Sequence, residues 1–189
     1  KVSGGRIPVV GNLLYNSVDM AVECMRGYEK AGCDAVIITP PTIYKYTEEG
    51  LFDYFKKIAQ NTELPVYLYN APETGNKVSP EVIARLFAEV PNMRGYKDST
   101  QDIIHQQTVL RLIGKERHFE LMAGSDAQIV PTYMLGGVGV FSLITCVFPK
   151  LIVDICKASE AGEWEKAKEL QEKILRVRQA LKVGPFMAA

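Results

Sequence analysis

Short apolar runs recur along the chain at intervals of about 27–31 residues, and this spacing constrains the fold more than any other feature. Between the runs lie longer stretches in which apolar residues repeat with a helical period. A strand followed by a helix occupies about 30 residues, so the pattern predicts a series of strand–helix units with parallel strands. Only the last interval is shorter. The six predicted strands are Ile7–Gly11, Ala35–Thr39, Val66–Asn70, Met93–Lys97, Glu120–Gly124 and Gly139–Leu143.

Helix signals fill the segments between these runs. Ser17 precedes an apolar pattern that stops at Gly32, a residue typical of a helix C-terminus. Thr47 precedes a second pattern of this kind. Ser79 and Pro80 precede a third, and serine suits the cap of a helix as proline suits its first position. The intervening segments are therefore predicted to be helices that cover the strands.

Parallel strands joined by helices occur in the open doubly wound sheet and in the (β/α)₈ barrel. No GxGxxG follows the first predicted strand and no Walker sequence is present, which weakens the nucleotide-binding alternative. A complete barrel needs about 250 residues, whereas this chain has 189. We expect an incomplete (β/α)₈ TIM barrel over residues 1–148, holding the third to the eighth strand. Residues 149–189 are expected to form terminal helices and the start of a C-terminal helical layer.

The composition argues against several classes of function. Lys plus Arg and Asp plus Glu both number 22, so the chain lacks the basic surplus of a nucleic-acid-binding protein. Its apolar runs are far shorter than a membrane span. The cysteines form no CxxC pair and none lies near a histidine, so we expect no metal site and interpret them as buried thiols of a cytoplasmic protein. They are Cys24, Cys33, Cys146 and Cys156.

Polar residues that end the predicted strands are the candidates for chemistry, because active sites of parallel α/β folds lie there. Lys97 ends the fourth strand. Burial at such a position favours a neutral amine, which attacks carbonyl groups; the alternative is a structural ion pair with Asp98 or Glu63. Tyr69 ends the neighbouring strand, where its hydroxyl either moves protons for the lysine or bonds to backbone in the core. Together the two residues predict a Schiff-base site.

The histidines and the tryptophan are weaker candidates. His105 lies in a helical pattern and His118 in a polar turn, so surface or helix-facing roles are expected for both. Trp164 is expected to anchor a hairpin formed by the last two predicted helices, residues 149–161 and 163–181.

Four motifs occur in order along the chain: Tyr69-Asn70-Ala71-Pro72, Gly95-Tyr96-Lys97-Asp98-Ser99, Gly124-Ser125-Asp126 and Leu135-Gly136-Gly137-Val138-Gly139. Together they resemble the dihydrodipicolinate synthase and N-acetylneuraminate lyase superfamily, and the resemblance covers nearly the whole chain. It implies a (β/α)₈ barrel with an added C-terminal helical layer, assembled as a homotetramer. It also implies a class I aldolase or lyase that acts on pyruvate or another 2-oxo acid and needs no cofactor.

The resemblance assigns roles to individual residues. Lys97 matches the lysine that condenses with the keto group, and Tyr69 matches the tyrosine that shuttles protons during imine formation and carbon–carbon bond cleavage. Three further positions match residues that contact hydroxyls of the longer substrates in sugar-acid members, and two more complete the expected substrate-binding set. These five residues are Ser99, Gly124, Asp126, Phe141 and Tyr44.

Three departures from the family pattern bear on function. The Gly-Thr-Thr/Ser-Gly-Glu loop that holds the pyruvate carboxylate is absent and is expected upstream, with the first two strand–helix units. Ile43 stands where many members carry a tyrosine donated across a subunit interface, with Tyr44 beside it. After Pro72 the chain reads Glu73-Thr74-Gly75, without the arginine that binds aspartate semialdehyde in dihydrodipicolinate synthases.

The missing arginine favours reversible cleavage of a 2-keto-3-deoxy sugar acid to pyruvate and an aldehyde, through an imine on Lys97. Dihydrodipicolinate synthase, which joins pyruvate to aspartate semialdehyde, remains an alternative, as does a keto-acid dehydratase. A non-catalytic keto-acid-binding member is the alternative outside enzymes, motivated by Ile43 and the incomplete barrel. The expected partners are small keto acids, aldehydes or sugar acids, with no nucleic acid and no membrane, and this stretch alone is expected to be inactive.

Overall fold

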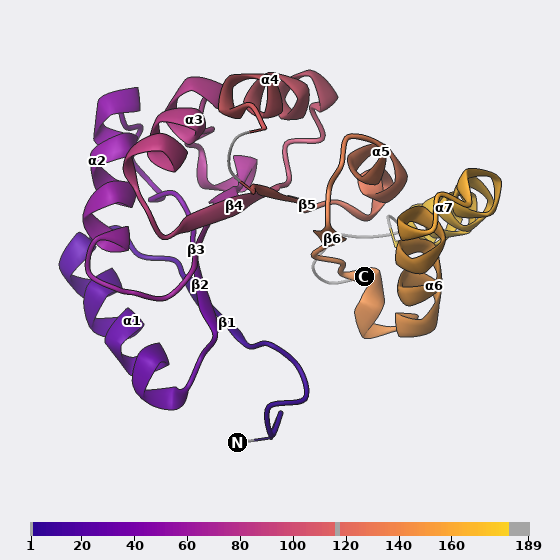
Figure 1. Ribbon diagram of the computed structural model, residues 1–189, viewed down its shortest axis with the longest axis horizontal. Helices are drawn as coiled ribbons and strands as arrows, with labels where there is room; N and C mark the ends of the chain where they lie inside the picture. The colour runs from indigo at the N-terminus through magenta and orange to yellow at the C-terminus, as the bar shows by residue number, and fades with distance from the viewer. Residues whose placement is uncertain (1, 116–117, 182–189) are drawn as a thin grey trace. The chain divides into compact units, whose positions relative to one another are not determined.

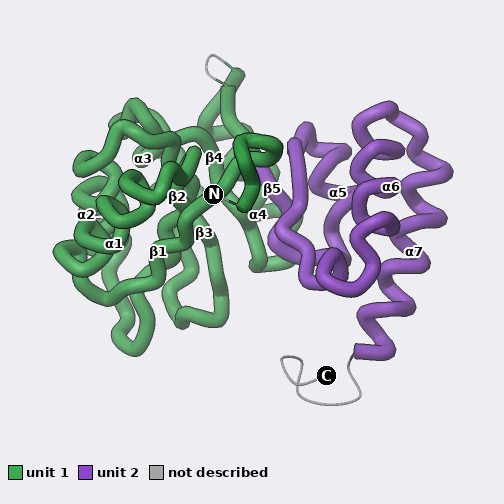
Figure 2. Tube along the Cα trace, turned by 90° about the horizontal axis from the view of Figure 1, so that it is seen from below, with its two compact units in different colours: residues 1–120 green, residues 121–189 purple. Residues whose placement is uncertain are grey.

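The computed structural model describes residues 2–115 and 118–181. The chain forms two compact units, Lys1–Glu120 and Leu121–Ala189, which Figure 2 colours separately and which are described in turn. The proposed division at residue 148 stays a prediction, and its last part, residues 182–189, lies outside the described residues. In the described ranges, no helix combines the length and the apolar character that a membrane crossing requires.

The first unit alternates strands and helices as the sequence predicts. Its four strands are parallel and lie side by side in chain order, with no reversal of the kind that defines a doubly wound sheet. The strands are β1 (Val10–Leu13), β2 (Ala35–Ile38), β3 (Val66–Asn70) and β4 (Met93–Asp98). The helices are α1 (Val18–Ala31), α2 (Glu48–Ala59), α3 (Pro80–Glu89) and α4 (Ile103–Ile113).

These helices lie along one side of the four strands, and each contacts the next along the chain (Figure 1). Strand β2 is buried at all four of its residues, as expected of a parallel strand that is covered on both faces. Apolar side chains of the helices complete the core beneath them, among them Phe55 and Ile58 of α2 and Leu86 of α3. Each helix buries its apolar face in this way, and this packing holds in place the strand ends that carry the candidate site.

The three predicted helix starts are confirmed, and two of them have side-chain capping bonds, whereas Ser17 precedes α1 without one. The Thr47 hydroxyl accepts the Gly50 N–H at 3.1 Å, and the Ser79 hydroxyl accepts the Val82 N–H at 3.3 Å. Gly32 ends α1 with φ 78°, a left-handed conformation that favours glycine.

Two predicted strands had wrong boundaries, and the first was wrong at both ends, since β1 runs to Leu13 rather than Gly11. The first strand begins at Val10 rather than Ile7, because Pro8 has no N–H to contribute to a ladder and the Val9 N–H bonds to the Asp34 carboxylate at 2.7 Å. The sixth strand ends at Val140 rather than Leu143, because the chain turns there into a short 3₁₀ helix, η3 (Ile144–Cys146).

The second unit holds β5 (Glu120–Ala123, which starts at the last residue of the first unit), the parallel strand β6 (Gly139–Val140) and a layer of helices. The helices are α5 (Ile129–Met134), α6 (Pro149–Glu160) and α7 (Trp164–Ala180). Helices α6 and α7 form the predicted hairpin, with Gly162 at φ 70° in the turn. Trp164 is half-buried against the apolar core of this unit, which confirms its expected anchoring position.

The expectation of buried thiols is wrong. All four cysteines are free, but three are only half-buried and Cys146 is exposed. Cys146 lies in the η3 turn rather than on a packed helix face, and the others lie beside, not within, the fully buried apolar stripes.

Candidate active site

The pairing of β3 with β4 places the candidate residues opposite one another. Tyr69 pairs with Lys97, and Asn70 pairs with Asp98. Because side chains alternate between the faces of a strand, Tyr69 and Lys97 share one face and Asn70 and Asp98 share the other. The ends of β3 and β4 therefore carry an amine and a phenol on one side and an amide and a carboxyl group on the other.

The first face carries the predicted nucleophile. Lys97 Nζ lies over the Tyr69 ring, 3.5 Å from its centroid, in a cation–π contact. The Ser99 hydroxyl donates to the Tyr69 hydroxyl at 3.3 Å, and the Ser99 N–H donates to the Asn70 carbonyl at 3.1 Å. Lys97, Tyr69 and Ser99 are all half-buried, so an amine and two hydroxyl groups meet at a partly accessible strand end.

The second face is a buried polar network centred on Asp98, which is completely buried. Its carboxyl oxygens accept from the Gln106 side-chain amide at 3.0 Å, the Thr100 hydroxyl at 2.9 Å and the Asn70 side-chain amide at 3.3 Å. These bonds tie the ends of β3 and β4 to helix α4. They also make Asp98 a poor ion-pair partner for Lys97, whose side chain points to the other face.

His105 belongs to this network, and its role was missed. It is buried, not at the surface, and its Nε2 lies 3.0 Å from the Asn70 side-chain nitrogen. The Asn70 side-chain oxygen accepts the Val78 N–H at 3.0 Å, so the nitrogen faces His105 as a donor and Nε2 accepts. Burial lowers the pKa of His105, which keeps the ring neutral. The signal in the sequence was helical spacing, since His105 shares a face with buried Val109.

Close packing requires a glycine at position 95, two residues before Lys97. A Cβ atom at Gly95 would lie 1.9 Å from the Glu120 carbonyl oxygen, so no larger residue fits without moving backbone. Tyr96, which follows, is completely buried, with its ring 5.8 Å from the Phe119 ring and 6.3 Å from the His105 ring between centroids. The two residues that precede Lys97 are thus tightly packed.

The loop before α2 presents Ile43 and Tyr44 to solvent. Ile43 has φ 73° and is 80% exposed, a strained conformation for a β-branched residue, and Tyr44 is 75% exposed. Buried Asn76 holds this loop by donating to the Pro41 and Tyr44 carbonyls, each at 2.8 Å, and accepting the Tyr46 N–H at 2.9 Å. Sequence reasoning missed Asn76, because a polar residue after a Gly in a loop is usually solvated.

The other predicted substrate-binding residues lie in the second unit. Gly124 is half-buried after β5, and Phe141 is 37% exposed after β6. Asp126 is 3% exposed, accepts a hydrogen bond from the Ser142 hydroxyl and lies 3.7 Å from an Arg178 nitrogen. Its backbone carbonyl accepts from the Gln171 side chain at 2.8 Å. Binding of substrate by these three residues stays a prediction.

Metal chemistry is not indicated by the side chains. Among the described residues, no group of three or more His, Cys, Asp or Glu side chains is arranged to hold a metal ion. The groups that meet at the strand ends are an amine and hydroxyls, which suit covalent and acid–base chemistry on a carbonyl compound.

Comparison with known proteins gives a consistent result. The sequence profile described as the Dihydrodipicolinate synthetase family matches residues 1–189. The 4-hydroxy-tetrahydrodipicolinate synthase of Alkaliphilus oremlandii is 38% identical over 168 residues, which are 88% of this chain and 57% of that protein. The chain therefore spans about three fifths of the length of the curated relatives it matches.

Solved structures show the same fold. Dihydrodipicolinate synthase from Thermotoga maritima is 32% identical with a TM-score of 0.91, over 97% of this chain and 63% of that one. YagE, a prophage protein of the dihydrodipicolinic acid synthase family from E. coli K12 in complex with pyruvate, is 27% identical with a TM-score of 0.90, over 96% of this chain and 62% of that one. The six strand–helix units are thus part of a TIM barrel, and the chain belongs to the dihydrodipicolinate synthetase family.

Proposed function

We propose that this chain carries the Schiff-base site of a class I aldolase that acts on pyruvate and related 2-oxo acids. The observation that carries the proposal is the position of Lys97 Nζ over the Tyr69 ring at the end of two parallel strands. Membership of the family and the pyruvate complex of the YagE structure support the same substrate class.

In the proposed reaction, the neutral amine of Lys97 attacks the keto carbon of the 2-oxo acid. The resulting carbinolamine loses its hydroxyl group as water and leaves a protonated imine. In the cleavage direction, the C4 hydroxyl gives up its proton as the C3–C4 bond breaks. The electron pair of that bond flows into the imine to give an enamine, and the aldehyde departs. Protonation at C3 and hydrolysis of the imine then release pyruvate and restore the amine.

Tyr69 is the proposed proton carrier for these steps. Its hydroxyl already accepts a hydrogen bond from Ser99, so a proton path of two hydroxyl groups lies next to the amine. The contact of Lys97 with the ring face also fixes where the amine points. The buried Asp98 network serves as the support that holds both strand ends in this arrangement.

We further propose 2-keto-3-deoxy sugar acids as the longer substrates. The segment after Pro72 forms a 3₁₀ turn, η1 (Pro72–Thr74), which ends at Gly75 with φ 83° and presents Glu73 to solvent. Glu73 therefore places a negative charge in this turn. Binding the carboxylate of aspartate semialdehyde would instead require a positive charge there. The second candidate is 4-hydroxy-tetrahydrodipicolinate synthase, the name of the curated relatives.

The test uses the whole protein that carries this chain. Incubation with pyruvate and borohydride should reduce the imine to a stable adduct, and peptide mass mapping should locate it at Lys97. Lys97→Arg, which keeps the charge, should form no adduct and lose at least about 10³-fold in turnover. A folded protein that forms no adduct would refute the Schiff-base assignment and favour a binding-only member, whereas an adduct only at another lysine would refute the role of Lys97.

Substrate choice needs a separate measurement. Initial rates of ketodeoxygluconate cleavage and of condensation with aspartate semialdehyde should be compared on one preparation. Faster cleavage supports the sugar-acid assignment. Turnover only with aspartate semialdehyde would replace it by the second candidate, while leaving the role of Lys97 intact.

A further inference from the structure

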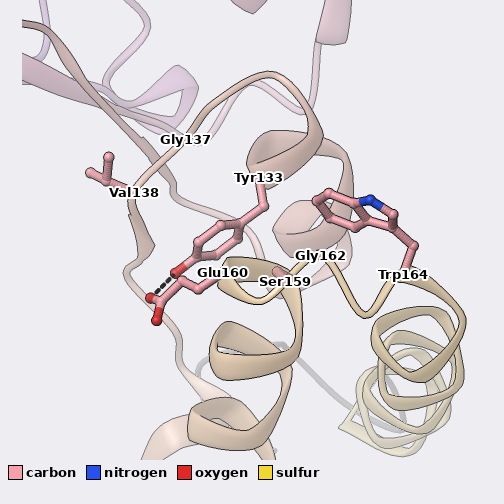
Figure 3. Close-up of a pocket in the computed structure, with 7 residues that line it drawn as sticks. All are labelled: Tyr133, Gly137, Val138, Ser159, Glu160, Gly162 and Trp164. Carbon is pink, nitrogen blue, oxygen red and sulfur yellow. Dashed lines mark hydrogen bonds between the residues drawn. The ribbon is translucent and has the colours of Figure 1, made fainter.

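The second unit contains a cavity of about 420 Å³ that none of the predicted site residues lines. Its walls come from α5, the loop before β6, the end of α6 and the start of α7 (Figure 3). The lining residues are Tyr133, Gly137, Val138, Ser159, Glu160, Gly162 and Trp164. This volume suits a small organic ligand.

Glu160 gives the cavity its charge. Four carboxylates of the α6–α7 hairpin are paired with cations, at Lys150–Asp154, Lys166–Glu163, Lys168–Glu165 and Arg176–Glu172. Glu160 differs, because its carboxylate accepts from the Tyr133 hydroxyl at 3.3 Å and forms no ion pair within the part of the chain that the structure describes. It is also the last residue of α6, where the helix dipole adds negative potential. The charge on this wall is therefore uncompensated.

Two aromatic residues complete a site suited to a cation. Figure 3 shows the Tyr133–Glu160 hydrogen bond at one side of the cavity and the Trp164 indole at the other. Burial raises the pKa of Tyr133, so its hydroxyl remains a neutral donor that orients the carboxylate. The Trp164 indole offers a large apolar surface against which the alkyl part of an ammonium compound can pack.

We propose that this cavity binds a small organic ammonium compound, with the ammonium group at the Glu160 carboxylate and its alkyl part against Trp164. A metal ion fits the site less well, since Glu160 is the one carboxylate among the lining residues and metals require several such ligands. The proposal is independent of the Schiff-base chemistry at Lys97.

Trp164 makes the proposal directly measurable, because the chain contains one tryptophan. In the whole protein, its fluorescence should be separated from any tryptophan outside this chain by comparison with Trp164→Phe. Titration with n-butylammonium chloride should change the Trp164 emission in a saturable way. 1-Butanol and sodium butyrate, at matched ionic strength, should give no saturable change. An equal response to the alcohol or to butyrate would overturn the proposal, as would no response together with no heat in calorimetry.

Charge-neutral variants identify the binding group. Glu160→Gln should weaken n-butylammonium binding about tenfold or more, because it removes the charge at nearly constant shape. Glu163→Gln is the matched control, since Glu163 is three residues away, pairs with Lys166 and does not line the cavity. Unchanged affinity in Glu160→Gln, or an equal loss in Glu163→Gln, would contradict the assignment.

Discussion

Lys97 and Asp98 are consecutive residues of one strand, yet they occupy opposite environments. Lys97 is half-buried, with its nitrogen over a tyrosine ring and hydroxyl groups nearby. Asp98 is completely buried and accepts hydrogen bonds from three side chains. One side of the strand end thus keeps a reactive group accessible, while the other side is fully bonded.

The difference shows how a strand end can be both reactive and rigid. A nucleophile needs access to substrate and a defined direction, and it gains little from many bonds of its own. The defined direction comes from the neighbouring face, where Asn70, Asp98 and Gln106 join two strands to helix α4. Changes on the Lys97 face should therefore affect chemistry, and changes on the Asp98 face should affect stability.

The largest expected effect on stability is at Asp98. Asp98→Ala leaves the Asn70 and Gln106 amides without a buried acceptor and should lower the free energy of unfolding by about 3 kcal/mol. Lys97→Met, one residue away, should cost about 1 kcal/mol or less, since the half-buried side chain keeps its apolar stem in the variant. Chemical denaturation of both variants measures the difference. Equal losses would show that the two faces are not energetically distinct.

The largest effect on turnover after the loss of Lys97 itself is expected at Tyr69. Tyr69→Phe keeps the ring beneath the lysine but removes the proposed proton carrier, so turnover should fall about 100-fold with little change in stability. Tyr67→Phe is the matched control, because Tyr67 shares the face and its hydroxyl donates to Glu120 at 2.6 Å. If both variants kept full turnover, the proton-carrier role would be excluded.

The buried face should also make stability depend on pH through His105. Its pKa in the folded protein is lowered by burial from an ordinary value of 6.5, so the unfolded chain takes up the proton first as pH falls. The contribution of His105 to the free energy of unfolding should be fully present above pH 6.5. It should fall as the pH drops below 6.5, by at most about 1.4 kcal/mol per pH unit. His105→Gln should flatten this slope between pH 6.5 and 5. A slope of the same size in the variant would assign it to other groups.

The smallest expected effect is a gain at Tyr96. Its hydroxyl is buried with no hydrogen-bond partner in the described structure, and burial raises its pKa. Tyr96→Phe keeps the ring contacts with His105 and Phe119 and should raise the free energy of unfolding by about 1 kcal/mol. Thermal unfolding measures this gain, and a clear loss of stability would show that the hydroxyl has a partner.

The sequence by itself determined the strand–helix alternation, most helix starts and the place of Lys97 and Tyr69. These follow from local rules: apolar periodicity, capping residues such as Thr47 and Ser79, and the position of active sites at strand ends. The spacing of these signals left a doubly wound sheet and a barrel open, and the absence of nucleotide-binding motifs and the resemblance to a known family favoured the barrel.

Tertiary structure alone decided which polar residues are buried together. His105 and Asn76 looked like ordinary helix and loop residues. The partner of His105 lies 35 positions away in the chain, and those of Asn76 lie 30 to 35 positions away. The same holds for Glu160, whose pairing with Tyr133 rather than with a lysine cannot be read from helical spacing. Long-range packing sets these partners; helical spacing can indicate that His105 faces the core, but it does not identify the residue to which it bonds.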